Sequence, residues 1–311
     1  MKLISDKIFK LPKIEISRIF SSHKYIILTY KRTCLILTKD LEIHQKYVDE
    51  NINEVFISAV LYHKYILLTG NNGILKIIDA CKGKYLYSLS GHGGKITDIK
   101  IYKDYIFTCS EDCSIRMWNK GICVAIFGGF VGHEDYILSI DISLCGKYLV
   151  SSSTDYTIKM WKIPYNQNNE PYKNGMENPQ KIIYPIFNTN KVHKSYITKV
   201  AFFGKMIISQ SINKITIIKP YFDTEIYKPN INSDLIFIND FYIDETSTKF
   251  IVYKNHLIYN KDKEIIDVNL RKFSIKKIPV KLNLKQMDMI DDRRIAILYR
   301  DGTVETFTII K

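Results

Sequence analysis

Residues 91–162 contain the same sequence pattern twice, and this repeat constrains the fold more than any other feature of the chain. The first copy runs from Gly91-His92 to Trp118, and the second runs from Gly132-His133 to Trp161. The two Gly-His pairs lie 41 positions apart. Because a unit of this length cannot bury its apolar face alone, it is expected to stack against further copies of itself.

A period of about 40–45 residues, with Gly-His near its start and Trp at its end, is the WD40 signature, in which each repeat forms one four-stranded blade. Short β-branched and aromatic segments, such as residues 25–29, 65–69 and 147–151, predict strands along the whole chain. We therefore predict an all-β fold, a seven-bladed WD40 β-propeller, with residues 1–311 forming a single domain.

Two blades are well formed in the sequence, at about residues 91–131 and 132–165, and a polar loop at residues 163–182 follows the second. The other blades are degenerate, and we place four of them at residues 14–45, 54–90, 235–270 and 282–310. The fifth contains His193 and ends at Ile218. Residues 7–11 are expected to supply the outer strand of the last blade, which would remove a free sheet edge.

Each well-formed blade carries four polar residues that can join in one buried chain of hydrogen bonds. Buried polar atoms are costly unless every member has a partner, so a complete set indicates a structural role. The two predicted structural tetrads are His92, Thr108, Asp112 and Trp118, and His133, Ser151, Asp155 and Trp161. Serine near histidine and aspartate also suggests a hydrolase triad, but the recurrence of the set with a tryptophan in each copy favours the structural interpretation.

Composition narrows the class of protein. The 46% apolar and 25% charged content is that of a globular chain. Six cysteines without a Cys-x-x-Cys pair predict reduced intracellular thiols, with no metal site and no cofactor. No apolar segment approaches ~18 residues, so we expect a soluble, non-secreted protein without a membrane partner or a small-molecule substrate.

The formal net charge of +13 suits an acidic partner such as nucleic acid. Lysine is abundant throughout the chain, however, and the basic residues form no run in the sequence. Direct contact with nucleic acid therefore stays open.

A more specific pattern lies within the repeats. It comprises residues 124–129, 131–135 and 138–141, together with residues 47–49 and 54–56, residues 91–93 with Ile96, and residues 180–182 with Pro185 followed by residues 193–197. These segments resemble the embryonic ectoderm development / extra sex combs (EED/ESC) family, the WD40 subunit of Polycomb repressive complex 2. The resemblance spans residues 47–220, and the remaining blades align only as generic repeats.

The resemblance implies a chromatin regulator of the nucleus that is not an enzyme. Such a scaffold docks the N-terminal segment of an Enhancer-of-zeste-like SET-domain methyltransferase. It reads the histone H3 tail on its other face, and so supports transcription repression by a histone methyltransferase complex. The alternative is a WD40 scaffold of another assembly, such as one in RNA processing or ribosome maturation.

Reading of methyl-lysine depends on an aromatic cage, in which ring faces attract the quaternary ammonium. The resemblance places the cage positions near Ser17, on Ile57, and on Phe237 and Ile238. Only Phe237 is aromatic, although Phe56 lies next to Ile57. Because one ring is a poor cage, we expect weak recognition of the methyl group.

Tyr136 and Tyr196 occupy equivalent positions in two neighbouring repeats, and Tyr196 matches a tyrosine that lines the histone-tail channel in the family. We expect both on the rim, as peptide contacts. The alternative is that they pack on neighbouring loops, since tyrosine is amphipathic.

Overall fold

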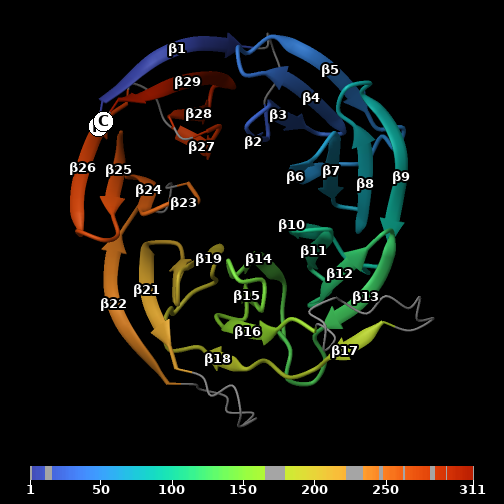
Figure 1. The fold of residues 1–311 in the computed structure, drawn as a ribbon, viewed down its shortest axis with the longest axis vertical. Helices are drawn as coiled ribbons and strands as arrows, with labels where there is room; N and C mark the ends of the chain where they lie inside the picture. The colour runs from blue at the N-terminus through green and yellow to red at the C-terminus, as the bar shows by residue number, and fades with distance from the viewer. Residues whose placement is uncertain are drawn as a thin grey trace. The chain divides into compact units, whose positions relative to one another are not determined.

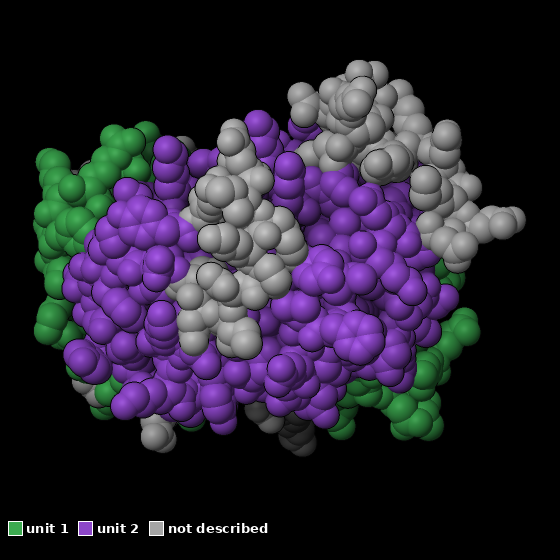
Figure 2. All heavy atoms as spheres, turned by 90° about the horizontal axis from the view of Figure 1, so that it is seen from below, with its two compact units in different colours: residues 1–71, 75–88, 243–311 green, residues 72–74, 89–242 purple. Residues whose placement is uncertain are grey.

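The computed structural model describes residues 2–10, 16–164, 179–221, 234–244, 248–261, 263–280, 284–291 and 293–310. These residues form β-strands joined by turns and loops, and none of them lies in a helix, so the described chain offers no membrane-spanning helix. Seven sheets follow one another along the sequence (Figure 1), which confirms the predicted seven-bladed β-propeller. The sheets divide into two compact units (Figure 2), which are described in turn.

Unit 1 comprises residues 1–71, 75–88 and 243–311 and contains four blades. Blade one has β2 (Arg18–Ser21), β3 (Tyr25–Tyr30), β4 (Thr33–Thr38) and β5 (Ile43–Val48). Blade two has β6 (Phe56–Tyr62), β7 (Tyr65–Gly70), β8 (Ile74–Asp79) and β9 (Lys84–Ser90). Blade six has β23 (Ile251–Tyr253), β24 (His256–Lys261), β25 (Glu264–Asn269) and β26 (Ser274–Pro279).

Blade seven joins the two ends of the described chain. Its strands β27 (Leu284–Met289), β28 (Arg294–Tyr299) and β29 (Thr303–Ile310) come from the C-terminal side, and β1 (Lys2–Lys10) pairs antiparallel with β29. Of the outer strand expected at residues 7–11, residues 7–10 lie in β1, which begins earlier, at Lys2, and residue 11 lies outside the described residues. Pairing covers the backbone edge that β29 would otherwise present.

Unit 2 comprises residues 72–74 and 89–242 and contains three blades. Blade three has β10 (Ile96–Tyr102), β11 (Tyr105–Ser110), β12 (Ile115–Asn119) and β13 (Ile122–Phe127). Blade four has β14 (Ile137–Ile142), β15 (Tyr148–Ser153), β16 (Ile158–Lys162) and β18 (Phe187–Thr189). Blade five has β19 (Lys199–Phe203), β20 (Met206–Gln210), β21 (Lys214–Pro220) and β22 (Leu235–Tyr242).

Three strands lie at positions that differ from those predicted from the sequence. Within the predicted loop at residues 163–182, residues 165–178 lie outside the described part, and β17 (Gln180–Ile182) pairs in parallel with β13 as a fifth strand of blade three. The fourth strand of blade four, β18, lies beyond residue 165. Strand β22 was expected to open blade six but closes blade five by pairing with β21.

Apolar side chains between neighbouring blades form the cores of each unit. In unit 1, one cluster joins blades seven and one, a second joins blades one and two, and a third joins blades six and seven. In unit 2, one cluster joins blades three and four and another joins blades four and five. Burial of these faces supplies the main stabilisation, since apolar area removed from water is worth about 25 cal/mol per Å².

Carboxylates on the first strands of blades three and four tie each of these two blades to the next one. Asp98 on β10 accepts hydrogen bonds from Ser139 Oγ at 3.0 Å and from the Ile140 amide at 3.2 Å, both on β14. Asp141 on β14 accepts from the Phe202 amide on β19 at 2.8 Å. These bonds fix the register between blades, because a buried carboxylate is tolerated only with donors in place.

Candidate functional site

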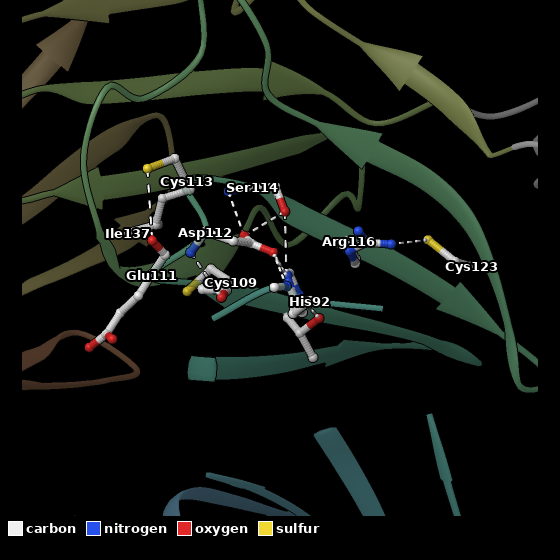
Figure 3. A network of polar contacts seen from close by, with 12 residues as sticks. His92, Cys109, Glu111, Asp112, Cys113, Ser114, Arg116, Cys123 and Ile137 are labelled. Atoms are coloured by element: carbon white, nitrogen blue, oxygen red, sulfur yellow. Dashed lines mark hydrogen bonds and ion pairs between the residues drawn. The ribbon is translucent and has the colours of Figure 1, made fainter. Parts of the chain in front are cut away.

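The tetrad of blade three is one continuous relay of hydrogen bonds. Trp118 Nε1 donates to Thr108 Oγ1 at 2.8 Å, and Thr108 Oγ1 lies 2.8 Å from His92 Nε2. On the other side of the ring, His92 Nδ1 lies 2.8 Å from Asp112 Oδ2 (Figure 3). A neutral imidazole with its proton on Nδ1 satisfies every member, since Thr108 then donates to Nε2 and accepts from the indole.

The aspartate of the relay also fixes the loop that precedes the blade. Asp112 Oδ2 accepts from the Gly93 amide at 2.9 Å, and Asp112 Oδ1 accepts from Ser114 Oγ at 2.7 Å. Burial by itself would raise the pKa of Asp112, but the hydrogen bonds from His92, Ser114 and Gly93 outweigh it and hold that pKa well below its usual range. The carboxylate therefore stays ionised and keeps its donors.

The tetrad of blade four repeats this geometry with a serine as the shared hydroxyl. Trp161 Nε1 donates to Ser151 Oγ at 2.9 Å, Ser151 Oγ lies 2.7 Å from His133 Nε2, and His133 Nδ1 lies 2.8 Å from Asp155 Oδ2. Just before the histidine, a Cβ on Gly132 would lie 2.8 Å from the Gly128 Cα. Only glycine fits there, which explains the Gly-His pair of the repeat.

These distances match those of a Ser-His-Asp triad, yet the surroundings do not suit catalysis. Ser151 is fully buried at 0% exposure, and its oxygen already accepts the indole N–H of Trp161. A nucleophile needs a substrate within reach and a free lone pair. We infer that both tetrads hold the blades together rather than carry chemistry.

Blade five keeps only part of the relay. His193 Nε2 lies 2.8 Å from Ser209 Oγ, whereas His193 Nδ1 is buried without a hydrogen-bond partner. Ile218 stands where the other two blades have tryptophan. Burial, together with the charge of Lys214, lowers the pKa of His193 to about 4. This blade is therefore held by apolar packing with a neutral imidazole at its centre.

Two adjacent serines on β15 test the importance of the shared hydroxyl. Both are at 0% exposure, but Ser151 serves the relay, whereas Ser152 Oγ makes only a 3.5 Å bond to the Ser139 carbonyl. We expect Ser151→Ala to lower the free energy of unfolding by about 2–4 kcal/mol, because the indole and the imidazole each lose a partner. Ser152→Ala is the matched control and should cost about 1 kcal/mol or less. Equal losses in chemical denaturation would contradict the relay.

The lone imidazole of blade five predicts a dependence of stability on pH. Because the unfolded imidazole binds a proton below about pH 6.5 and the folded one only below about pH 4, this contribution is complete above pH 6.5 and is lost as the pH falls towards 4. The free energy of unfolding lost over this pH range amounts to about 3 kcal/mol. His193→Gln keeps a polar partner for Ser209 and should flatten this acid dependence. Denaturation at pH 4.5 and pH 7 would measure it, and an unchanged slope would count against the assignment.

The predicted rim tyrosines are exposed. Tyr136, at 48% exposure, precedes β14, and Tyr196, at 42%, precedes β19. Their loops are ordered by backbone hydrogen bonds, since the Thr154 amide donates to the Tyr136 carbonyl and the Ile197 amide donates to the Ser153 carbonyl. Both rings are thus presented at the same end of neighbouring blades of unit 2.

The structure does not present Phe56 in the way a cage requires. Its side chain is 1% exposed and lies in the core between blades one and two, 6.2 Å from the Tyr47 ring centroid. Ile57 is half-buried at a break in register between β6 and β7. This β-bulge leaves Ile57 unpaired and turns Phe56 inward, so the expected access of Phe56 to a ligand is wrong.

Phe237 also lies elsewhere than expected. It is 50% exposed on β22, opposite Ile218 near the end of β21, and therefore belongs to blade five. Tyr196 lies before β19, at the opposite end of the same blade. The length of β19, five residues at about 3.3 Å each, separates these two ends, so Phe237 and Tyr196 do not share one binding surface.

Sequence reasoning missed a buried ionic cluster in unit 1. Lys76 Nζ lies 2.5 Å from Asp49 Oδ2 and 3.0 Å from Glu54 Oε2, and Tyr47 donates to Asp49 at 2.9 Å. Lys76 Nζ also lies 6.0 Å from the Phe56 ring centroid. The cluster anchors the loop between blades one and two. Its ammonium group, Lys76 Nζ, lies over the ring of Phe56. The clustering of carboxylates at residues 49–54 was its only signal in the sequence.

The described residues hold no group of three or more histidine, cysteine or carboxylate side chains that could bind a metal ion. All six cysteines are free thiols. The sites that the described residues define are therefore structural relays and exposed loop surfaces.

Comparison with known proteins identifies the class of fold to which the chain belongs. The family model "WD domain, G-beta repeat" matches residues 83–119 and 121–162, the two blades that contain the complete tetrads. The fold matches a chain of the Chaetomium thermophilum Polycomb repressive complex 2 with a TM-score of 0.83, over 99% of this chain and 98% of that one, at 16% identity. The chain is a WD40-type seven-bladed β-propeller.

The sequence relatives are more specific. The chain is 30% identical to the Polycomb protein esc of Drosophila virilis over 230 residues, which is 66% of this chain and 54% of that protein. It is 33% identical to the Polycomb protein EED of Chaetomium thermophilum over 162 residues, which is 49% of this chain and 28% of that protein. The predicted resemblance to the EED/ESC family is confirmed, and the matched part spans about half the length of esc.

Proposed function

We propose that this protein is a non-catalytic WD40 scaffold subunit of a Polycomb-type histone H3 lysine methyltransferase complex in the nucleus. The observation that carries the proposal is the similarity to Polycomb protein esc across 66% of the chain. The fold supports it, since a rigid scaffold of blades presents its loops as binding surfaces. The partner that this proposal names is an Enhancer-of-zeste-like SET-domain methyltransferase.

Affinity purification of the protein from its own cells tests the partner. We expect a SET-domain methyltransferase to co-purify in stoichiometric amount and to survive washing with moderate salt, because an obligate scaffold buries a large interface. The Ser151→Ala variant, which weakens blade four, should recover less of it, whereas Ser152→Ala should behave as the native chain. Recovery of RNA-processing or ribosome-maturation factors in place of a methyltransferase would favour the alternative scaffold.

Recognition of the methyl group is proposed to be weak. Three observations support this: Phe56 is buried, Ile57 is not aromatic, and Phe237 lies at the other end of its blade from Tyr196. A quaternary ammonium gains about 0.5–2 kcal/mol from a well-placed ring, and the described positions offer no assembled set of rings. Tyr136 and Tyr196 remain as candidate contacts to the peptide itself.

Calorimetric titration with histone H3 peptides separates these two roles. We expect trimethylated and unmethylated peptides to bind with affinities within about threefold of each other, since little cation–π energy is available. The double variant Tyr136→Ala/Tyr196→Ala should weaken both equally. Tyr87→Ala, which removes a tyrosine of 51% exposure on β9, is the matched control. A strong preference for the trimethylated peptide would overturn the assignment.

A further inference from the structure

Strand β9 forms the outer edge of blade two and presents apolar side chains to solvent. It is hydrogen-bonded to β8 on its inner side (Figure 1), and no described residue pairs with its outer edge. Tyr85, Leu86 and Tyr87 on this strand are 47%, 43% and 51% exposed. An edge of unpaired backbone N–H and C=O groups beside apolar side chains is a template for a further strand.

The other three outer strands of unit 1 carry charges that oppose such pairing. Lysines lie within each of them, and they are Lys7 on β1, Lys46 on β5, and Lys276 and Lys277 on β26. Strand β9 has a lysine only at its first position, Lys84. Charged side chains within an edge strand are a common protection against pairing with another chain, so β9 is the least protected outer strand of unit 1.

Blade three shows how this fold treats an outer strand without charge. Strand β13 contains no charged residue, and its edge is covered by β17, with Ala125, Ile126 and Phe127 paired in parallel with residues 180–182. An outer strand of this chain therefore accepts a fifth strand where no charge blocks the edge. By the same reasoning, the occupant that fits β9 is an extended strand.

Exposed apolar side chains of unit 1 gather on blades one and two and on the loop that connects them. Besides the three on β9, they are Ile43, Val48, Ile52 and Val55. The Gln45 side chain on β5 donates to the Cys81 carbonyl at 3.1 Å, which holds β5 beside the turn that leads into β9. The apolar edge of β9 thus has a neighbouring surface on β5, as an interface needs.

We propose that β9 pairs with β9 of a second copy of this chain, antiparallel about a twofold axis. With Leu86 on the axis, Tyr85 of each copy lies opposite Tyr87 of the other, and aromatic pairs across strands are stabilising. Lys84 then lies opposite Ser88. The two copies of Lys84 are about 13 Å apart along the strands, beyond the screening length of about 8 Å at physiological salt.

The strand is therefore complementary to itself, and a twofold interface is the commonest one between identical chains. Pairing would join two blades into one continuous sheet and remove the unprotected edge from both copies. This role goes beyond the proposed scaffold function and does not depend on it.

Sedimentation equilibrium of the full chain tests the proposal. We expect a reversible dimer over roughly 1–100 µM, the range in which a modest interface dissociates. Leu86→Lys and Leu86→Glu should each raise the dimer Kd by about tenfold or more, because like charges then face each other across the axis. An equimolar mixture of the two variants should associate with a Kd within about threefold of that of the native dimer, because the opposed charges are then opposite in sign.

The matched control is Ile275→Lys, which places the same charge at a residue of 54% exposure on the outer strand β26. It should leave the dimer Kd within about twofold of native, since β26 takes no part in the pairing.

Three outcomes would overturn the proposal. The first is a native chain that stays monomeric up to roughly 100 µM, which would leave the β9 edge to a strand of a different protein. The second is a dimer that Ile275→Lys weakens as much as Leu86→Lys does. The third is a failure of the lysine and glutamate variants to associate with each other while circular dichroism shows both folded. None of these outcomes bears on whether a methyltransferase co-purifies.

Discussion

Two hydroxyl oxygens, Thr108 Oγ1 and Ser151 Oγ, stand at the centre of the best-formed part of this protein. Each accepts an indole N–H and faces an imidazole nitrogen, which in turn is tied to an aspartate. Because a buried polar atom without a partner costs about 1–3 kcal/mol, the four members stabilise the blade only as a set. The set links the loop before the blade to its second and third strands.

The same requirement operates between blades. Asp98 and Asp141 are placed on first strands so that amides and hydroxyls of the next blade donate to them. Burial raises the pKa of Asp141, and the Phe202 amide offsets part of that effect. Apolar clusters supply most of the stabilisation of the blades, while these directional bonds decide which strand lies beside which. A scaffold with fixed loop positions follows from the two together.

The end of unit 2 that carries Tyr136 and Tyr196 has its own chemistry. Both rings are exposed there, on loops beside others that carry carboxylates and the ion pair of Lys95 with Glu111, which suits an extended peptide. The net charge of +13 alone does not show this, because it says nothing of where the charges gather.

The sequence by itself determined the repeat, the seven blades and the members of both tetrads. These depend on spacing along the chain, and each blade is a local antiparallel unit. The tertiary structure alone decided the rest. Residues 222–233, which lie outside the described part, separate β21 from β22, and only pairing assigned β22 and Phe237 to blade five. A β-bulge at Ile57 accompanies the burial of Phe56 in the core between blades one and two. Such outcomes depend on register and pairing between distant segments, which local sequence patterns do not encode.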